Sequence, residues 1–155
     1  MGAWDADSFQ NDTALDWVGD LCEGGDVAAV RTALSRVMEE RRSVRPSFIG
    51  RLLGRRPVEP YLEARVASEG LAAAEIVAFW LGHPDPHFPG KLAEWARRHS
   101  DAMSPEFIAF ARQAVSTIKT KSELKDLWEE GDGIVAPKWH NAIADLERRL
   151  ESPDT

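Results

Sequence analysis

The sequence predicts an all-α, single-domain bundle of six to seven helices, with an extended segment at its N-terminus. Apolar residues recur at the three- and four-residue spacing of amphipathic helices almost everywhere, and the alternation typical of strands is almost absent. The chain has 155 residues, 43% of them apolar, including 6 Trp and 6 Phe. A chain of this length can bury roughly 68–70% of its unfolded surface, so its core needs no metal or disulfide. We expect residues 1–155 to form one domain.

The first half of the chain predicts two helices, a break and a long third helix. Asn11 or Asp12 is the candidate N-cap of the first helix, and Gly24 is its stop. The apolar face of this helix comprises Ala14, Leu15, Val18, Leu21 and Cys22. Asp26 can cap the second helix, whose apolar stripe comprises Val27, Val30, Leu34, Val37 and Met38. A break rich in Pro and Gly follows, and Pro60 suits the first turn of a helix that ends near Leu81.

The second half predicts a buried helix followed by surface helices. Residues 71–81 read LAAAEIVAFWL, which is apolar nearly all round and typical of a central helix. A short helix follows around Leu92, Trp95 and Ala96, and Ser104 with Pro105 opens the next. That helix has an inner face of Phe107, Ile108, Ala111, Val115 and Ile118. A short turn is expected at 122–128, and Pro137 begins the last helix, with Trp139, Ile143, Leu146 and Leu150 aligned.

Composition restricts the class of protein. The net charge is −7, which disfavours a nucleic-acid binder that relies on general electrostatics. The single cysteine, Cys22, excludes an internal disulfide and suits a reducing compartment. No apolar stretch approaches the ~18 residues needed to span a membrane, and the acidic start MGAWDAD is unlike a signal peptide. These features predict a cytoplasmic protein with no cofactor.

The N-terminal sequence MGAWDADSFQNDTALDW resembles the opening of a bacterial family known as domain of unknown function 4259. The shared positions are Gly2, Trp4, Phe9, Asn11, Asp12, Ala14 and Asp16. The similarity continues in EGLAAAEIVAFWLG, SELKDLWEEG and ADLERRL, and it omits roughly residues 41–60. Family members often carry glycines where this chain has Asp5 and Asp7. The resemblance supports the fold class, and it implies no activity.

The N-terminal segment is also strongly acidic. Seven carboxylates fall within residues 5–26, and the first basic residue after them is Arg31. We interpret Asp12, Asp16, Asp20 and Glu23 as the outer face of the first helix and as a binding surface for a basic partner. The competing interpretation is structural: Asn11, Asp12 and Asp16 stabilise the N-terminal end of the helix. Trp4 and Phe9 then pack into the core of the bundle. A Ca²⁺ site is disfavoured, because the Gly turn and closing Glu of an EF-hand are absent.

Glu75 is a carboxylate within the most apolar helix. Burial would require a partner, and it would also suit a general acid or base. No His or second carboxylate accompanies it at helical spacing, so we favour a structural anchor that binds backbone or indole N–H groups. We expect a buried carboxylate that accepts hydrogen bonds from residues 2–9.

Two further segments carry alternative hypotheses. His83, Asp85 and His87 offer two imidazoles and a carboxylate to a metal, but Pro84 and Pro86 favour a turn. Residues 41–56 contain six arginines interleaved with apolar residues, which is compatible with RNA or an anionic membrane. We interpret about 43–57 as a variable loop against the acidic surface of the protein.

The leading hypothesis for the whole chain is a non-catalytic protein-interaction domain of the kind to which immunity proteins belong. The alternatives are a small metal-dependent enzyme that uses Glu75 or His83, Asp85 and His87, and a nucleic-acid or membrane contact through the arginine segment.

Overall fold

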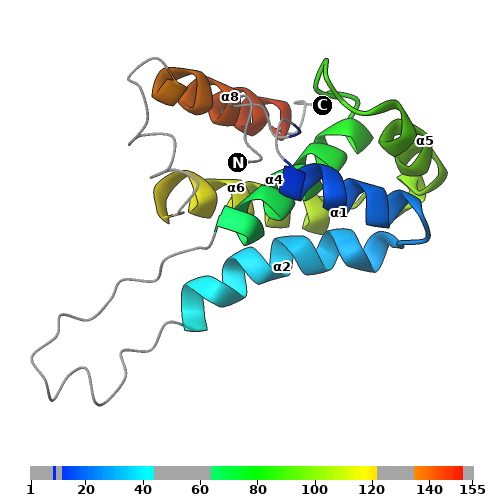
Figure 1. Cartoon of the computed structure of the whole chain (residues 1–155), viewed down its shortest axis with the longest axis horizontal. Helices are drawn as coiled ribbons and strands as arrows, with labels where there is room; N and C mark the ends of the chain where they lie inside the picture. Colours follow the sequence, from blue (N-terminus) through cyan, green and yellow to red (C-terminus); the bar gives the residue numbers. More distant parts are fainter. Residues whose placement is uncertain (1–8, 10–11, 44–63, 122–134, 152–155) are drawn as a thin grey trace, which may run out of the picture.

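The computed structural model describes Phe9 and residues 12–43, 64–121 and 135–151 of the chain. Regular structure within these residues is helical and includes no strand, which confirms the all-α prediction. The helices are α1 (Asp12–Cys22), α2 (Val27–Ser43), α4 (Ala64–Trp80), α5 (Gly90–Arg98), α6 (Pro105–Lys121) and α8 (Val135–Arg149), shown in Figure 1. A single 3₁₀ turn, Ser100–Ala102, joins α5 to α6.

Helix α4 is the centre of the bundle (Figure 1). Every residue from 66 to 78 is buried. Within the apolar run LAAAEIVAFWL, residues 71–78 are buried as predicted, whereas Phe79, Trp80 and Leu81 are partly buried. Helices α1, α2, α5, α6 and α8 all contact α4. Their buried residues join those of α4 in one hydrophobic core. The contact of each surrounding helix with α4 therefore determines its position in the bundle.

At Gly70, helices α2 and α6 both pack closely against α4. A Cβ atom built on Gly70 would lie 2.6 Å from Cγ2 of Val37 in α2 and 3.3 Å from Cδ1 of Ile118 in α6. Val37 and Ile118 are both fully buried, so neither can move away without disturbing the core. The absent side chain of Gly70 therefore lets α2 and α6 pack tightly on α4.

The predicted signals for helix ends operate as expected. The Asp26 side chain accepts a hydrogen bond from the backbone N–H of Ala28 at 2.9 Å, which caps α2. Ser104 Oγ accepts one from the N–H of Phe107 at 3.3 Å at the start of α6. After α4, Gly82 adopts a φ of 87°, and the N–H groups of Gly82 and His83 donate to the carbonyls of Phe79 and Ala78. This is the Schellman pattern, which satisfies carbonyls at the end of the helix.

Some helix boundaries differ from those predicted. Helix α4 ends at Trp80 instead of Leu81, while its predicted start at Pro60 lies outside the described residues. Helix α8 begins at Val135, two residues before Pro137. A proline at the third helical position is tolerated, because the first four N–H groups of a helix have no partner within the helix. The turn predicted at 122–128 lies outside the described residues.

Two residues of the predicted apolar face of α1, Leu15 and Cys22, are less buried than expected. Ala14, Val18 and Leu21 are buried, but Leu15 is 37% exposed. Leu15 is rotated by about 100° from Ala14 around the helix, which takes it off the buried stripe. Cys22 is half-buried and packs against the core, whereas its position on the apolar face predicts full burial. Burial nevertheless raises the pKa of its thiol, more than the charges of Lys91 and Arg98 lower it.

Phe9 is the described residue of the N-terminal segment that tests its predicted packing role. It is buried, and its ring meets that of Phe88 edge to face at a centroid distance of 5.3 Å. Phe88 in turn stacks on Phe79 of α4 at 4.7 Å. Phe9 therefore packs into the bundle as expected, whereas Trp4 and Asn11 lie outside the described residues.

Among the described helices, none has the length and apolar character that crossing a membrane requires.

Candidate functional site

The outer face of α1 carries four carboxylates. Asp12, Asp16, Asp20 and Glu23 are all exposed, as the sequence predicts. At 3.6 residues per turn they fall within a sector of about 80° around the helix axis, opposite the buried stripe. The exposed side chain of Leu15 borders this sector. We call the four carboxylates the acidic face of α1.

The carboxylates of the acidic face lack close ion pairs with the described residues. Within the described part of the chain, none of its four carboxylates has an ion-pair partner within 4.0 Å. The pairs Asp12–Asp16 and Asp16–Asp20 are like charges four residues apart, which destabilise a helix by about 0.2–0.5 kcal/mol each. Asp20 and Glu23 also lie near the C-terminal end of α1, where negative charge opposes the helix dipole. Helix stability alone therefore does not explain this row of charges.

Glu75 is held by a residue that sequence reasoning missed. Its oxygens accept hydrogen bonds from both terminal nitrogens of Arg149 in α8, at 2.7 and 3.0 Å. The side chain of Glu75 is 1% exposed and that of Arg149 is 12% exposed. The predicted burial of Glu75 is confirmed. Its predicted donors lie within residues 2–9, of which the structure describes only Phe9, so that part stays a prediction.

Arg149 also connects the end of α8 to the loop after α4. Its Nη1 donates to the carbonyl of His83 at 3.3 Å, and its Nη2 lies 3.6 Å from Oδ2 of Asp85. Its Nε donates to Asp145, one turn back along α8, at 2.7 Å. In return, Nδ1 of His83 lies 3.1 Å from the carbonyl oxygen of Arg149. Since a carbonyl oxygen only accepts, this contact is a hydrogen bond in the tautomer that carries its hydrogen on Nδ1 of His83.

This network fixes the charge of its members. Burial opposes the charged form of the Arg149 guanidinium, but the hydrogen bonds and charges of Glu75 and Asp145 outweigh it and raise the Arg149 pKa. Partial burial favours the neutral form of Asp145, but hydrogen bonds and charges from Arg149 and then Arg148 lower the Asp145 pKa overall. An arginine that binds carboxylates on two helices and a loop acts as a structural clamp.

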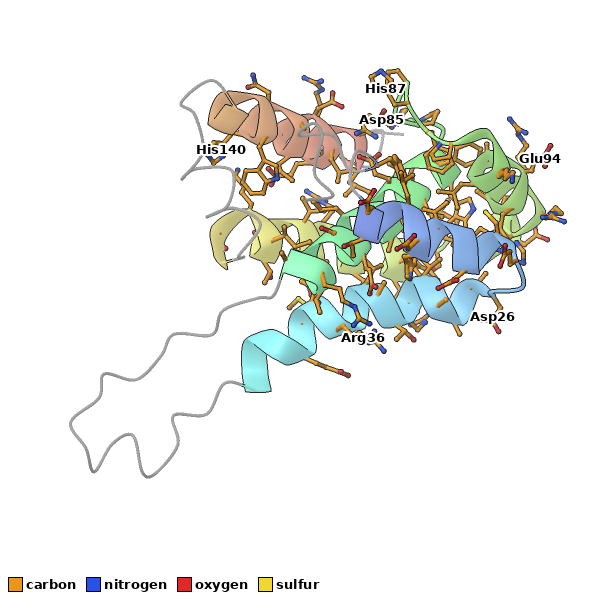
Figure 2. The ribbon with its side chains drawn as sticks, viewed as in Figure 1. Asp26, Arg36, Asp85, His87, Glu94 and His140 are labelled. Carbon is orange, nitrogen blue, oxygen red and sulfur yellow. The ribbon has the colours of Figure 1, made fainter. Side chains whose placement is uncertain are left out.

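The segment His83–His87 forms the turn that its prolines predict. Figure 2 shows Asp85 and His87 at the loop between α4 and α5. Oδ1 of Asp85 accepts a hydrogen bond from the backbone N–H of His87 at 2.6 Å, while the exposed His87 ring has its Nδ1 3.6 Å from the same oxygen. His83 instead bonds to the end of α8. Among the described residues, no three His, Cys, Asp or Glu side chains are placed to hold a metal.

A signal for Arg149 was available but ambiguous. Asp145 and Arg149 are four residues apart, and Arg149 directly precedes the buried Leu150. Basic residues in the last turn of a helix are common, because they favour its dipole, and Arg148 beside it is 73% exposed. The sequence alone therefore could not distinguish the buried arginine from its exposed neighbour.

The chain matches a family model. The model is described as Domain of unknown function (DUF4259), and it matches residues 2–48 and 45–142. No curated protein and no solved structure matches the chain significantly. The expected resemblance is thus confirmed over most of the sequence. The match includes residues 41–60, which we expected it to omit, and it ends at residue 142, before the segment ADLERRL.

Proposed function

The chain belongs to the family described as Domain of unknown function (DUF4259), and from that premise we propose that it is a non-catalytic domain that binds a basic protein. The observation that carries this proposal is the acidic face of α1. Four exposed carboxylates lie on one helix, and they have no ion-pair partner in the described part of the chain. A basic partner would relieve the repulsion between them.

The charge of this face and its exposed leucine both suit an encounter with another protein. The net charge of −7 adds to the field of this face, and such a field raises association rates by about 10–10³ while losing strength as salt rises. Leu15 supplies an apolar contact beside the charges. Apolar contacts bordered by polar groups are typical of protein interfaces.

The cellular setting is part of the proposal. A single free cysteine suits a reducing compartment, so we place the interaction in the cytoplasm. A small acidic helical domain that blocks a basic protein would act as immunity proteins do toward toxin enzymes. This comparison is an analogy of size and charge.

The alternative functions have weaker support. An enzyme based on Glu75 would need a free carboxylate oxygen, but Arg149 engages both. An enzyme based on His83, Asp85 and His87 would need side chains that converge, whereas Asp85 and His83 bond to the loop and to α8. The nucleic-acid or membrane alternative rests on residues 41–56, whose side chains lie outside the described structure.

Site-specific crosslinking in cells tests the proposal. A photoreactive residue at Leu15, beside the acidic face, is compared with one at Ala109, which is exposed on α6. We expect Leu15 to capture a specific protein of basic isoelectric point and Ala109 not to capture it. Capture of acidic proteins only, or of the same proteins at both positions, would contradict the proposal.

The captured protein is then purified and its affinity measured at several salt concentrations. The test variant changes Asp16→Asn, Asp20→Asn and Glu23→Gln. The control changes Glu39→Gln, Glu94→Gln and Asp101→Asn, which removes the same charge from exposed positions elsewhere; Glu94 is labelled in Figure 2. We expect the test variant to lose affinity and salt dependence, and the control to retain both. Equal behaviour of the two variants would eliminate the acidic face as the binding surface.

A further inference from the structure

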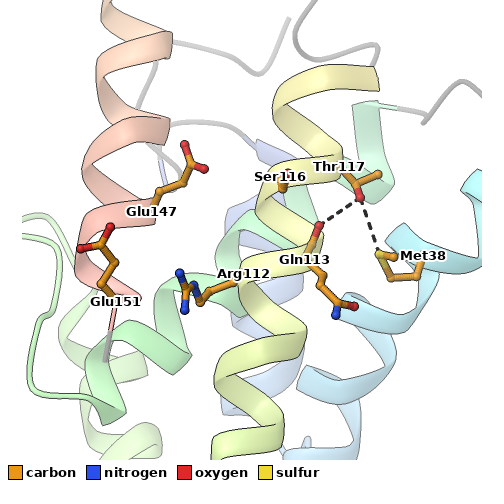
Figure 3. Close-up of a pocket in the computed structure, with 7 residues that line it drawn as sticks. All are labelled: Met38, Arg112, Gln113, Ser116, Thr117, Glu147 and Glu151. Atoms are coloured by element: carbon orange, nitrogen blue, oxygen red, sulfur yellow. Dashed lines mark hydrogen bonds between the residues drawn. The ribbon is translucent and has the colours of Figure 1, made fainter. Parts of the chain in front are cut away.

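A groove of about 540 Å³ lies between α2 and α8, with α6 as its floor (Figure 3). Arg112, Ser116 and Thr117 of α6 line the floor. Met38 of α2 forms one wall, and Glu147 of α8 forms the other together with Glu151, which lies two residues beyond the end of α8. Its volume falls within the roughly 300–1,000 Å³ of pockets that hold small molecules.

The lining of the groove favours a polar ligand over a packed helix. A helix seated on α6 would need an apolar stripe beneath it, but the exposed floor residues are polar or charged. Thr117 is 5% exposed, and its hydroxyl donates to the carbonyl of Gln113 at 3.0 Å (Figure 3). A hydroxyl that donates once retains two acceptor lone pairs. The floor therefore offers hydrogen-bonding groups instead of apolar surface.

The charges in the groove are of opposite sign and face each other. Figure 3 shows Arg112 reaching from α6 toward Glu147 of α8 and Glu151, which follows the end of that helix. Glu147 is paired with Lys119 at 3.1 Å. Neither Arg112 nor Glu151 has an ion-pair partner among the residues that the structure describes. One cation and one carboxylate are thus available across the same groove.

From this arrangement we propose that the groove binds a small zwitterion of the amino-acid or short-peptide class. The ligand carboxylate pairs with Arg112, and the ligand ammonium pairs with Glu151 beside Glu147. A simple anion would satisfy Arg112 only, and a simple cation would satisfy Glu151 only. A molecule that carries both charges neutralises both groups at once.

This site is separate from the acidic face of α1. Helix α1 contributes no residue to the groove lining, and α1 and α6 are both packed on the central helix α4. An experiment that contradicts the zwitterion site therefore leaves the proposed protein partner unaffected, and the reverse also holds.

Titration with trialanine, followed by backbone amide NMR, tests the site on the full chain. N-acetyl-trialanine lacks the ammonium group, and trialanine amide lacks the carboxylate. We expect trialanine to shift the amides of residues 112–117 and 147–151 in a saturable manner. Each capped peptide should bind about tenfold more weakly, because it leaves one charged group of the groove unpaired. The absence of a saturable shift up to roughly 10 mM trialanine, about tenfold above a Kd of about 1 mM, would overturn the proposal.

Two variants assign the charges to their partners. Arg112→Gln should remove the preference for trialanine over trialanine amide, and Glu151→Gln should remove the preference over N-acetyl-trialanine. Both residues are exposed, so the fold is expected to survive either change. Asp16→Asn on α1 is the control, and it should leave all three affinities unchanged. Equal binding of the three peptides to the unmodified chain, or retention of both preferences in both variants, would refute the assignment.

Discussion

Glu75 of α4 and Arg149 of α8 form a two-pronged ion pair with distances of 2.7 and 3.0 Å, although 74 residues separate them along the chain. The pair joins the central helix to the last described helix. The Glu75 side chain is 1% exposed and that of Arg149 is 12% exposed. Arg149 compensates the buried charge of Glu75, and it also pairs with Asp145 and Asp85.

Removing Arg149 alone should therefore be costly. Arg149→Met leaves Glu75 buried without its cation, and we expect the free energy of unfolding to fall by about 3–5 kcal/mol. The double variant Glu75→Met with Arg149→Met should recover about 1–3 kcal/mol of this loss, because it removes the unpaired charge. Denaturant unfolding of the four proteins of this cycle measures both values. Arg148→Met, at a 73% exposed neighbour, is the control and should cost less than about 0.5 kcal/mol. A similar cost for the two arginines would contradict a clamping role for Arg149.

Gly70 and Gly19 should respond oppositely to replacement by alanine. At Gly70 the new methyl group would meet Val37 at 2.6 Å, and overpacking of this kind costs about 1–3 kcal/mol. Nothing lies within 4 Å of a Cβ built on Gly19 in α1, so Gly19→Ala should gain about 0.5–1 kcal/mol from helix propensity. Thermal and denaturant unfolding of both variants provide the comparison. Stabilisation by Gly70→Ala would mean that α2 and α6 can move away from α4 at little cost.

Acid should weaken the Arg149 network through Asp145. The folded state lowers the pKa of Asp145 below its ordinary value of 3.8, so its contribution to stability is present above that value. The contribution is lost as the pH falls through the lower, folded pKa. Asp145→Asn should consequently destabilise the protein at pH 7, and the difference from the unmodified chain should shrink toward pH 2. Unfolding curves measured between pH 2 and 7 test this dependence. A difference that is constant across the range would show that the charge of Asp145 is not responsible.

Neutralising the C-terminal part of the acidic face should stabilise α1. Asp20→Asn and Glu23→Gln together remove charges that oppose the helix dipole, and we expect a gain of a few tenths of a kcal/mol, about 0.2–0.5. The gain should diminish as salt is added. Glu106→Gln is the contrasting control, since Glu106 lies in the first turn of α6 and pairs with Arg31 at 3.0 Å. Destabilisation by the α1 changes would indicate that these carboxylates have a structural role and weaken the proposed binding surface.

The helices could be predicted because their signals are local. Apolar residues at helical spacing identify the buried faces, and Asp26, Gly82 and Ser104 act within a few residues of the helix ends they define. Leu15 shows the limit of this reasoning, because a periodic pattern does not establish how wide the buried stripe of a helix is. The variable loop expected at about 43–57 lies almost wholly outside the described residues and stays a prediction.

The candidate site could be predicted only in part. Exposure of the acidic face of α1 follows from the position of its apolar stripe, which is again local information. The partner of Glu75 depends on how α8 packs against α4, and no spacing rule connects residues 75 and 149. The groove depends on three helices that are distant in sequence, so its lining was not foreseeable from any one of them.

The position of α4 has a consequence for protein synthesis. Glu75 leaves the ribosome 74 residues before Arg149, and at about 5–20 residues per second this interval is roughly 4–15 s. During this interval Glu75 lacks its ion pair with Arg149, so burial of its carboxylate within α4 costs more free energy than in the complete chain. The nascent chain therefore completes its bundle only after α8 has been made. Ribosome-bound chains that stop before Arg149 would expose α4 to chaperones and proteases.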